Sequence, residues 1–151
     1  MESARPLPQA ILFACNHNAI RSPMAEALMR LRFGKAVWVD SCGLRKGAEV
    51  DSFAVSVMEE LGADLRKHRP KAFADLDDAS FDMIVTLTPE AHHRALEFTR
   101  TMAVDVEYWP TMDPSLAQGS RDQRLDEYRA LRDALERRIA TRFQRPLTGA
   151  G

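Results

Sequence analysis

The clearest chemical signal in the sequence is one short segment, Cys15-Asn16-His17-Asn18-Ala19-Ile20-Arg21-Ser22. It follows an apolar run and precedes a helical pattern, so it is predicted to turn over the N-terminus of a helix. Such a turn points backbone N–H groups at one spot, and the helix dipole favours negative charge there. We therefore expect this segment, the cysteine loop (residues 15–22), to bind phosphate or a similar oxyanion.

The side chains of the cysteine loop suit nucleophilic chemistry on a bound oxyanion. Arg21 offers a planar charged fork that can hold two oxygens at once. The local field favours the thiolate of Cys15, which is the nucleophilic form, and Ser22 is placed to donate a hydrogen bond to the sulfur. Asn18 tolerates a left-handed backbone. The competing interpretation is that Cys15 is a small buried side chain at a strand end; the spacing to Arg21 and Ser22 favours the nucleophile.

A candidate acid lies much later in the chain. Asp113 follows the last predicted strand, and Pro114 stiffens the backbone after it. A carboxyl group at the same sheet edge as Cys15 could protonate a leaving oxygen. Asp-Pro is also a common turn sequence, which is the alternative for this pair.

The elements that must position these residues alternate between strands and helices. Apolar runs predict strands, and apolar residues at helical spacing predict helices. The expected strands are 10–14, 36–40, 83–87 and 105–109, and the expected helices are 22–33, 51–61, one opened by Pro89, and 121–143. This order predicts an α/β fold, a single three-layer domain with a four-stranded parallel sheet and helices on both faces. Ligands of such sheets bind beyond the carboxyl ends of the strands.

Length and composition fit this plan. With 151 residues and 17.0 kDa the chain is predicted to form one domain over residues 10–144, flanked by tails at 1–9 and 145–151. A net charge of −1 gives no footprint for nucleic acid or an anionic membrane surface. The longest apolar run, from Ala10 to Cys15, is too short to span a bilayer, and no signal peptide is recognisable. Two cysteines cannot build a disulfide framework, so a cytoplasmic location is expected.

The histidines look less informative. His92 and His93 are neighbours on a predicted helix, so their side chains diverge and cannot chelate one ion. His68 falls in Lys67-His68-Arg69, which is typical of a solvated loop. We expect no metal site and no cofactor.

Four motifs in order resemble the low-molecular-weight protein tyrosine phosphatase family, which includes a branch of arsenate reductases. The resemblance covers nearly the whole chain. The motifs are the cysteine loop continuing into Pro23-Met24-Ala25-Glu26, then Val39-Asp40-Ser41-Cys42-Gly43, Phe81-Asp82-Met83-Ile84-Val85, and Asp113-Pro114.

The resemblance implies a two-step reaction without metal. Cys15 attacks phosphorus while Asp113 protonates the leaving group, and Asp113 then activates the water that hydrolyses the phosphocysteine. Arg21 and the loop amides hold the equatorial charge, and Ser41 bonds Asn18 to shape the loop. The implied partner is a phosphorylated protein or a small phosphomonoester.

The sequence departs from the family pattern at several positions. His17 replaces a loop glycine, Ile20 replaces the family's partner cysteine within the loop, and Thr88 stands where an aspartate is frequent. Aromatic walls around the site are missing; the corresponding positions are Leu44, Arg45, Ser115 and Leu116. These departures bear on substrate choice more than on reaction type.

Three functions therefore stand side by side. The first is a phosphomonoesterase of the protein tyrosine phosphatase type. The second is an arsenate reductase or thiol redox enzyme, for which Cys42 is the candidate redox partner of Cys15; the alternative is that Cys42 is a packed small residue. The third is a phosphate- or phosphoprotein-binding module that has lost catalysis, motivated by His17 and the missing aromatics.

Overall fold

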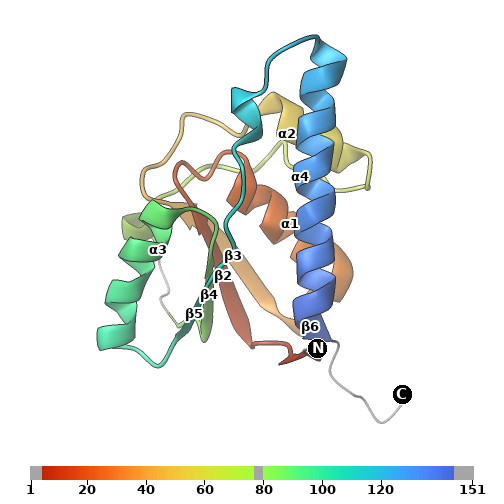
Figure 1. Cartoon of the computed structure of the whole chain (residues 1–151). Coiled ribbons are helices and arrows are strands. Elements are labelled where there is room, and N and C mark those ends of the chain that lie inside the picture. Colours follow the sequence, from red (N-terminus) through yellow and green to blue (C-terminus); the bar gives the residue numbers. More distant parts are fainter. Residues whose placement is uncertain (1–4, 77–79, 145–151) are drawn as a thin grey trace, which may run out of the picture.

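The computed structural model describes residues 5–76 and 80–144. Its centre is a parallel sheet of four strands in the order β3-β2-β4-β5 (Figure 1). The strands are β2 (Ala10–Cys15), β3 (Trp38–Gly43), β4 (Met83–Thr86) and β5 (Asp105–Tyr108). The predicted α/β class and four-stranded parallel sheet are confirmed.

Helices cover both faces of this sheet. The α-helices are α1 (Arg21–Phe33), α2 (Ser52–Glu59), α3 (Pro89–Leu96) and α4 (Arg121–Arg142). Short 3₁₀ turns occupy Gly34–Ala36, Phe73–Asp75, Glu97–Arg100 and Pro114–Leu116. In Figure 1, α1, α2 and α4 lie on one side of the sheet and α3 lies on the other. Within the described residues, no helix has the length and apolar content needed to cross a membrane.

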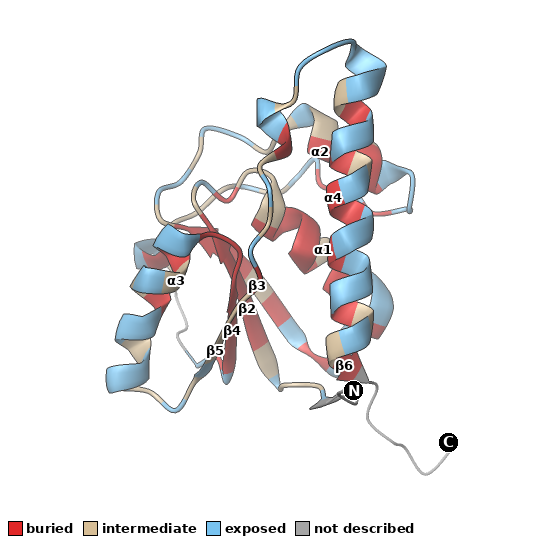
Figure 2. Cartoon of the chain, in the orientation of Figure 1, coloured by how far each residue is buried: buried red, intermediate tan, exposed pale blue. Residues whose placement is uncertain are grey.

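The two faces of β2 fill two separate cores. Ile11, Phe13 and Cys15 belong to the larger core beneath α1 and α4. Leu12 and Ala14 belong to the smaller core on the α3 side. Every residue from Ile11 to Cys15 is buried (Figure 2), as the unbroken apolar run predicts for a central strand.

The structure differs from the predicted elements in detail. The second strand of the sheet begins at Trp38 and not at Ala36, because Gly34–Ala36 form a 3₁₀ turn after α1. It also continues through Ser41 and Cys42 to Gly43. Leu31 is one of the apolar residues at helical spacing that predict the helix at 22–33 and its buried face, yet it is 48% exposed. Leu61 lies beyond the end of α2 and is also exposed.

A second, two-stranded sheet joins segments near the two ends of the chain. β1 (Arg5–Pro6) pairs in parallel with β6 (Phe143–Gln144). Part of the predicted N-terminal tail is therefore a strand, and Phe143 leaves the last helix to pair with it. The predicted tail at 145–151 and residues 1–4 lie outside the described residues.

Candidate active site

The cysteine loop turns its carbonyl groups outward, toward the segment that follows β3. Four of its carbonyls accept hydrogen bonds from backbone amides of that segment. The pairs are Leu44 to Cys15 at 3.1 Å, Arg45 to Asn16 at 3.0 Å, Gly47 to His17 at 2.9 Å and Asp51 to Ala19 at 3.0 Å. Gly43 permits this contact, because a Cβ there would lie 2.8 Å from the Asn16 carbonyl oxygen and 2.8 Å from the Asn18 nitrogen.

The amide groups of the same loop remain free to bind an anion. No backbone N–H of residues 16–22 donates to an acceptor among the described residues. The N-terminus of α1 also lacks a side-chain cap, whereas Asp51, Thr88 and Ser120 cap the other three helices. Uncapped amides and a helix dipole directed at one spot are the features that bind phosphate in proteins.

Cys15 lies at the base of the loop with its sulfur against a hydroxyl group. The Sγ of Cys15 is 2.9 Å from the Oγ of Ser22, and both side chains are buried. The Ser22 hydroxyl is also 3.3 Å from the Cys42 carbonyl oxygen. Since a hydroxyl carries one hydrogen, it can donate to the carbonyl while Cys15 is a thiol and to the sulfur once Cys15 is a thiolate.

Asn18 fixes the shape of the loop from its centre. It is fully buried and has a positive φ of 56°, the left-handed conformation predicted for it. Its Nδ2 donates to the Oγ atoms of Ser22 at 2.8 Å and Ser41 at 2.9 Å. The predicted contact between Ser41 and Asn18 is thus present in the structure.

A buried carboxylate continues this chain of hydrogen bonds. The Ser41 hydroxyl donates to Oε1 of Glu26, and Arg30 on the next turn of α1 pairs with Oε2. Glu26 is 6% exposed, so the ion pair compensates a charge that burial alone would make costly. In the sequence, Glu26 is recognisable only as the last residue of the motif Pro23-Met24-Ala25-Glu26. Its position four residues before Arg30 is the local signal for this ion pair.

His68, predicted to lie in a solvated loop, is instead half-buried against Asn18. Its Nε2 lies 3.0 Å from Oδ1 and 3.2 Å from the backbone oxygen of Asn18, while the Lys71 amide donates to the same Oδ1 at 3.0 Å. Both partners of Nε2 are acceptors, so Nε2 carries the hydrogen. Burial lowers the pKa of His68, and the nearby Glu26 carboxylate opposes that shift.

Two contacts tie neighbouring segments to the loop. The Arg21 guanidinium donates from Nη1 to the carbonyl of Thr111 at 3.0 Å. Thr88, the residue that caps α3, donates its hydroxyl to Oδ1 of Asn16 at 2.8 Å. Thr88 is therefore among the residues that contact the cysteine loop. The Thr111 contact holds the segment that carries Asp113 next to Arg21 of the same loop.

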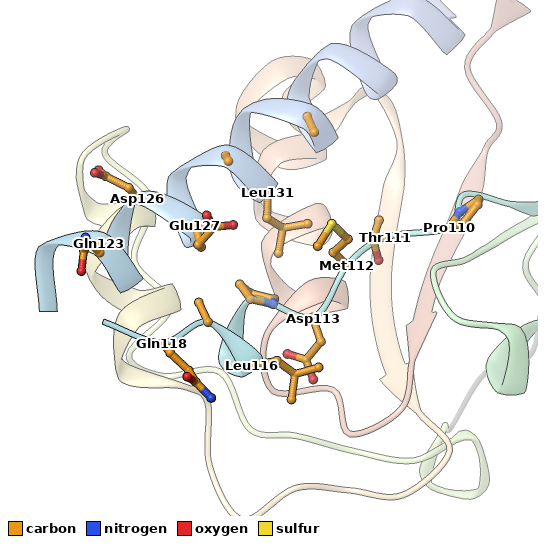
Figure 3. Close-up of a pocket in the computed structure, with 14 residues that line it drawn as sticks. Pro110, Thr111, Met112, Asp113, Leu116, Gln118, Gln123, Asp126, Glu127 and Leu131 are labelled. Atoms are coloured by element: carbon orange, nitrogen blue, oxygen red, sulfur yellow. The ribbon is translucent and has the colours of Figure 1, made fainter. Parts of the chain in front are cut away.

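Asp113 begins the 3₁₀ turn Pro114–Leu116 and holds Ser115. Its Oδ1 accepts from the Ser115 amide at 2.9 Å and from the Ser115 hydroxyl at 2.6 Å. Its Oδ2 has no hydrogen-bond partner among the described residues, which leaves it available to carry a proton. Figure 3 shows the Asp113 carboxylate pointing away from α4.

Cys42 and Cys15 point to opposite faces of the sheet. Cys15 pairs in register with Gly43, and Ala14 pairs with Cys42, so the two sulfurs lie in different cores. Burial raises the pKa of Cys42 far above its usual range. A disulfide would need backbone movement, because the Cβ directions diverge. The structure does not bring the two cysteines together as the predicted redox pair requires.

The remaining predicted residues line the mouth of the site. His17 is exposed, as are Arg45 and Lys46 on the facing segment. Ala19 and Ile20 are half-buried, and Ile20 packs on the larger core. Leu44 packs against the smaller core, so Leu116 alone of the two leucines stands exposed beside the acid.

The described part of the chain offers no constellation for a metal. Within it, no group of three or more His, Cys, Asp or Glu side chains is placed to hold an ion. His92 is half-buried, with its Nδ1 2.9 Å from the Thr86 hydroxyl and its ring stacked on Tyr108. Its neighbour His93 is exposed.

Comparison with known proteins gives relatives with three different activities. A low molecular weight protein-tyrosine-phosphatase of Streptomyces coelicolor is 32% identical over 83% of this chain and 82% of its own. An arsenate reductase of Bacillus subtilis is 28% identical over 85% of this chain and 91% of its own. The YwlE arginine phosphatase structure from Geobacillus stearothermophilus superposes with a TM-score of 0.73 at 26% identity, covering 89% of this chain and 90% of that one.

These relatives share one family despite their different names. The sequence profile described as "Low molecular weight phosphotyrosine protein phosphatase" matches residues 10–145, nearly the whole described chain. The match begins at Ala10, the first residue of β2, so it includes Cys15, and it runs past the end of α4. This chain belongs to the low molecular weight phosphotyrosine protein phosphatase family, whose members include phosphatases and arsenate reductases.

Proposed function

We propose that this chain is a phosphomonoesterase of the protein tyrosine phosphatase type that works through a phosphocysteine. The observation that carries the proposal is the set of unbonded amides of residues 16–22, in the loop that follows Cys15. Such a set matches the oxygens of a bound phosphoryl group and stabilises the charge that spreads over them during transfer. A phosphorylated protein or a small phosphomonoester is the proposed substrate, and the cytoplasm is the proposed compartment.

In the first step the Cys15 thiolate attacks phosphorus in line with the leaving oxygen. The S–P bond forms as the P–O bond breaks, and the proton on Oδ2 of Asp113 passes to the leaving oxygen. The Ser22 hydroxyl, 2.9 Å from the sulfur, stabilises the thiolate before attack. Arg21 keeps Nη1 on the Thr111 carbonyl and presents its remaining N–H groups to the phosphoryl oxygens.

In the second step water hydrolyses the phosphocysteine. Asp113, now a carboxylate, takes a proton from the water as its oxygen attacks phosphorus, and the Cys15 thiolate leaves with the electron pair of the S–P bond. The Ser22 hydroxyl again donates to the departing sulfur. Phosphate is then released and Asp113 is protonated for the next cycle.

Hydrolysis of p-nitrophenyl phosphate tests this function. We expect turnover by the wild-type protein and a loss of several orders of magnitude in both Cys15→Ser and Arg21→Ala. Cys42→Ala is the matched cysteine control, because Cys42 lies in the other core, and it should stay within about threefold of wild type. Activity of Cys15→Ser within tenfold of wild type would exclude the phosphocysteine mechanism.

Arsenate reduction is the second candidate function, favoured by relatives that carry that name. The same oxyanion loop would hold arsenate, but the chain has two cysteines in all and Cys42 faces away from Cys15. An external thiol would therefore have to resolve the oxidised Cys15. Arsenate reduction measured with glutathione or mycothiol, beside the phosphatase assay, separates the two activities.

A binding module without catalysis is the third candidate. His17 motivates it, since a side chain replaces the family's glycine. However, His17 is exposed, so its ring need not occupy the space above the amides. Phosphate binding without any turnover of aryl phosphate would favour this third function over the first.

A further inference from the structure

A cavity of about 1020 Å³ lies between the segment that carries Asp113 and the outer face of α4 (Figure 3). The mechanism above uses two of its lining residues, Asp113 and the Thr111 carbonyl that holds Arg21. The cavity therefore begins at the proposed acid and extends away from the cysteine loop toward α4. The Asp113 carboxylate itself points away from α4, so the cavity lies on the other side of the segment that carries the proposed acid.

The walls of this cavity carry large apolar side chains, two of which are highly exposed. Met112 and Leu116, which flank Asp113, are 81% and 77% exposed, and both line the cavity. Leu131 of α4 forms part of the opposite wall, with Ala130 and Ala134 on the same helix. Two large apolar side chains this exposed on one wall of a cavity favour contact with a bound hydrocarbon chain, and the buried Leu131 lies in the opposite wall.

The polar end of the cavity is negative. Glu127 of α4 is exposed and lines the cavity (Figure 3), and it has no hydrogen-bond or ion-pair partner among the described residues. Asp126 also lines the cavity but is held by Arg129 at 2.7 Å. No lysine or arginine is among the lining residues in the described chain. Glu127 is thus a carboxylate without a partner in the lining of this cavity.

The opposite rim of the site has the opposite charge. Arg45 and Lys46 are exposed on the segment that follows β3, against the far side of the cysteine loop. Positive charge therefore lies on the segment that contacts the cysteine loop, and the lining of the cavity carries the negative charge of Glu127. This polarity selects a cationic group for the cavity and excludes an anionic one.

We propose that this cavity binds the side chain of an arginine or lysine that neighbours the phosphorylated residue of a protein substrate. The proposal rests on the proposed phosphatase function. The methylene stem of the bound residue packs on Met112, Leu116 and Leu131, and its charged head pairs with Glu127. The cavity thus acts as a subsite that chooses the sequence around the phosphorylation site.

Fluorescence anisotropy with labelled peptides tests the subsite. Each peptide carries phosphonomethyl-phenylalanine, a non-hydrolysable analogue of phosphotyrosine, with arginine, norleucine or glutamate at each of the two positions on either side. Dissociation constants are measured for the wild-type protein, Glu127→Gln and Glu127→Lys. Glu136→Gln is the matched control, since it removes one exposed carboxylate from the same helix outside the cavity.

We expect arginine at one flanking position to bind at least tenfold more tightly than glutamate. Glu127→Gln should remove most of that preference, Glu127→Lys should reverse it, and Glu136→Gln should keep it. Equal affinity for the three peptides at every position, or an arginine preference that survives Glu127→Lys, would overturn the subsite. Hydrolysis of p-nitrophenyl phosphate by the wild-type protein is read separately, so failure of the phosphatase function is distinguished from failure of the subsite.

Discussion

The Nε2 atom of His68 lies 3.0 Å from Oδ1 of Asn18, although 50 positions separate the two residues in the sequence. Because Oδ1 is held by His68 and Lys71, the Nδ2 of Asn18 is directed at Ser22 and Ser41. The orientation of one amide thus links a distant loop to the hydroxyl that touches the Cys15 sulfur. We therefore infer that His68 is a positioning residue for the proposed nucleophile, Cys15.

This contact predicts a pH dependence of stability. Burial lowers the pKa of His68 in the folded chain below its usual value of 6.5, so between these two values the unfolded chain binds more protons. Stability contributed by neutral His68 is therefore present above pH 6.5 and is lost as the pH falls through this window. Thermal unfolding followed from pH 7.5 to pH 5 should show a falling Tm in the wild-type protein.

Two variants check that His68 is the source. His68→Gln retains an N–H donor but does not titrate, so its Tm should fall less over the same range. His93→Gln, which changes an exposed histidine, should keep the wild-type slope. If His68→Gln and the wild-type protein lose Tm in parallel, another group is responsible.

Asp113 gives a prediction about leaving groups. Asp113→Asn cannot deliver a proton, so turnover should fall most for esters whose leaving oxygen is strongly basic. We expect a loss of at least a hundredfold for phenyl phosphate and a much smaller one for p-nitrophenyl phosphate, measured as kcat/KM, which reports the steps through P–O cleavage and not the shared hydrolysis of the phosphocysteine. Equal losses for both esters would mean that another residue is the acid.

Gly43 gives a prediction about the shape of the cysteine loop. A Cβ at Gly43 would meet three backbone atoms at 2.8, 2.8 and 2.9 Å, and backbone yields less easily than a flexible side chain. We expect Gly43→Ala to lower the free energy of unfolding by about 1–3 kcal/mol and to reduce kcat. Gly47→Ala is the graded control, because its nearest backbone atom is 3.2 Å away, and its effects on both quantities should be smaller.

The missing aromatic walls predict weak selection for phosphotyrosine. The Ser115 hydroxyl donates a hydrogen bond to Asp113, so replacing Ser115 would remove that contact. The exposed Leu116 is therefore the better position at which to add an aromatic ring. A stacking contact is worth about 0.5–1.5 kcal/mol, so Leu116→Tyr should lower KM for phosphotyrosine about 2- to 12-fold. KM for an alkyl phosphate should change less. A wild-type preference for phosphotyrosine peptides of a hundredfold or more would contradict this interpretation.

Local patterns were sufficient to predict a four-stranded parallel sheet and the order of its strands and the helices along the chain. The apolar run that ends at Cys15 predicts a buried strand, and the helical spacing after Arg21 predicts a helix. Together they place Cys15 at the end of the strand and Arg21 at the start of the helix without knowledge of the rest of the chain. The start of β3 was missed by two residues, because the 3₁₀ turn at Gly34–Ala36 has no apolar period of its own. Leu31 was misassigned because an apolar residue at helical spacing can still face solvent at the edge of a stripe.

The shell around the loop was harder to predict, because its contacts are long-range. Nothing near Lys67-His68-Arg69 indicates that His68 folds onto Asn18. The opposed directions of Cys15 and Cys42 follow from strand register, which pairs Cys15 with Gly43. The predicted strands, 10–14 and 36–40, end before both cysteines and do not define that register. The cavity beside α4 depends likewise on how a helix and a loop from different parts of the chain come together.

The pairing of β1 with β6 has a practical consequence for handling the protein. Both strands lie at the edge of the sheet where β2 begins, as the Trp38 amide bond to the Gln9 carbonyl also indicates, and Cys15 lies at the other edge (Figure 1). An affinity tag or surface linker joined beyond either strand would therefore leave from the side remote from the substrate. The chain can be anchored beyond β1 or β6 with the face that carries the cysteine loop turned toward the solution.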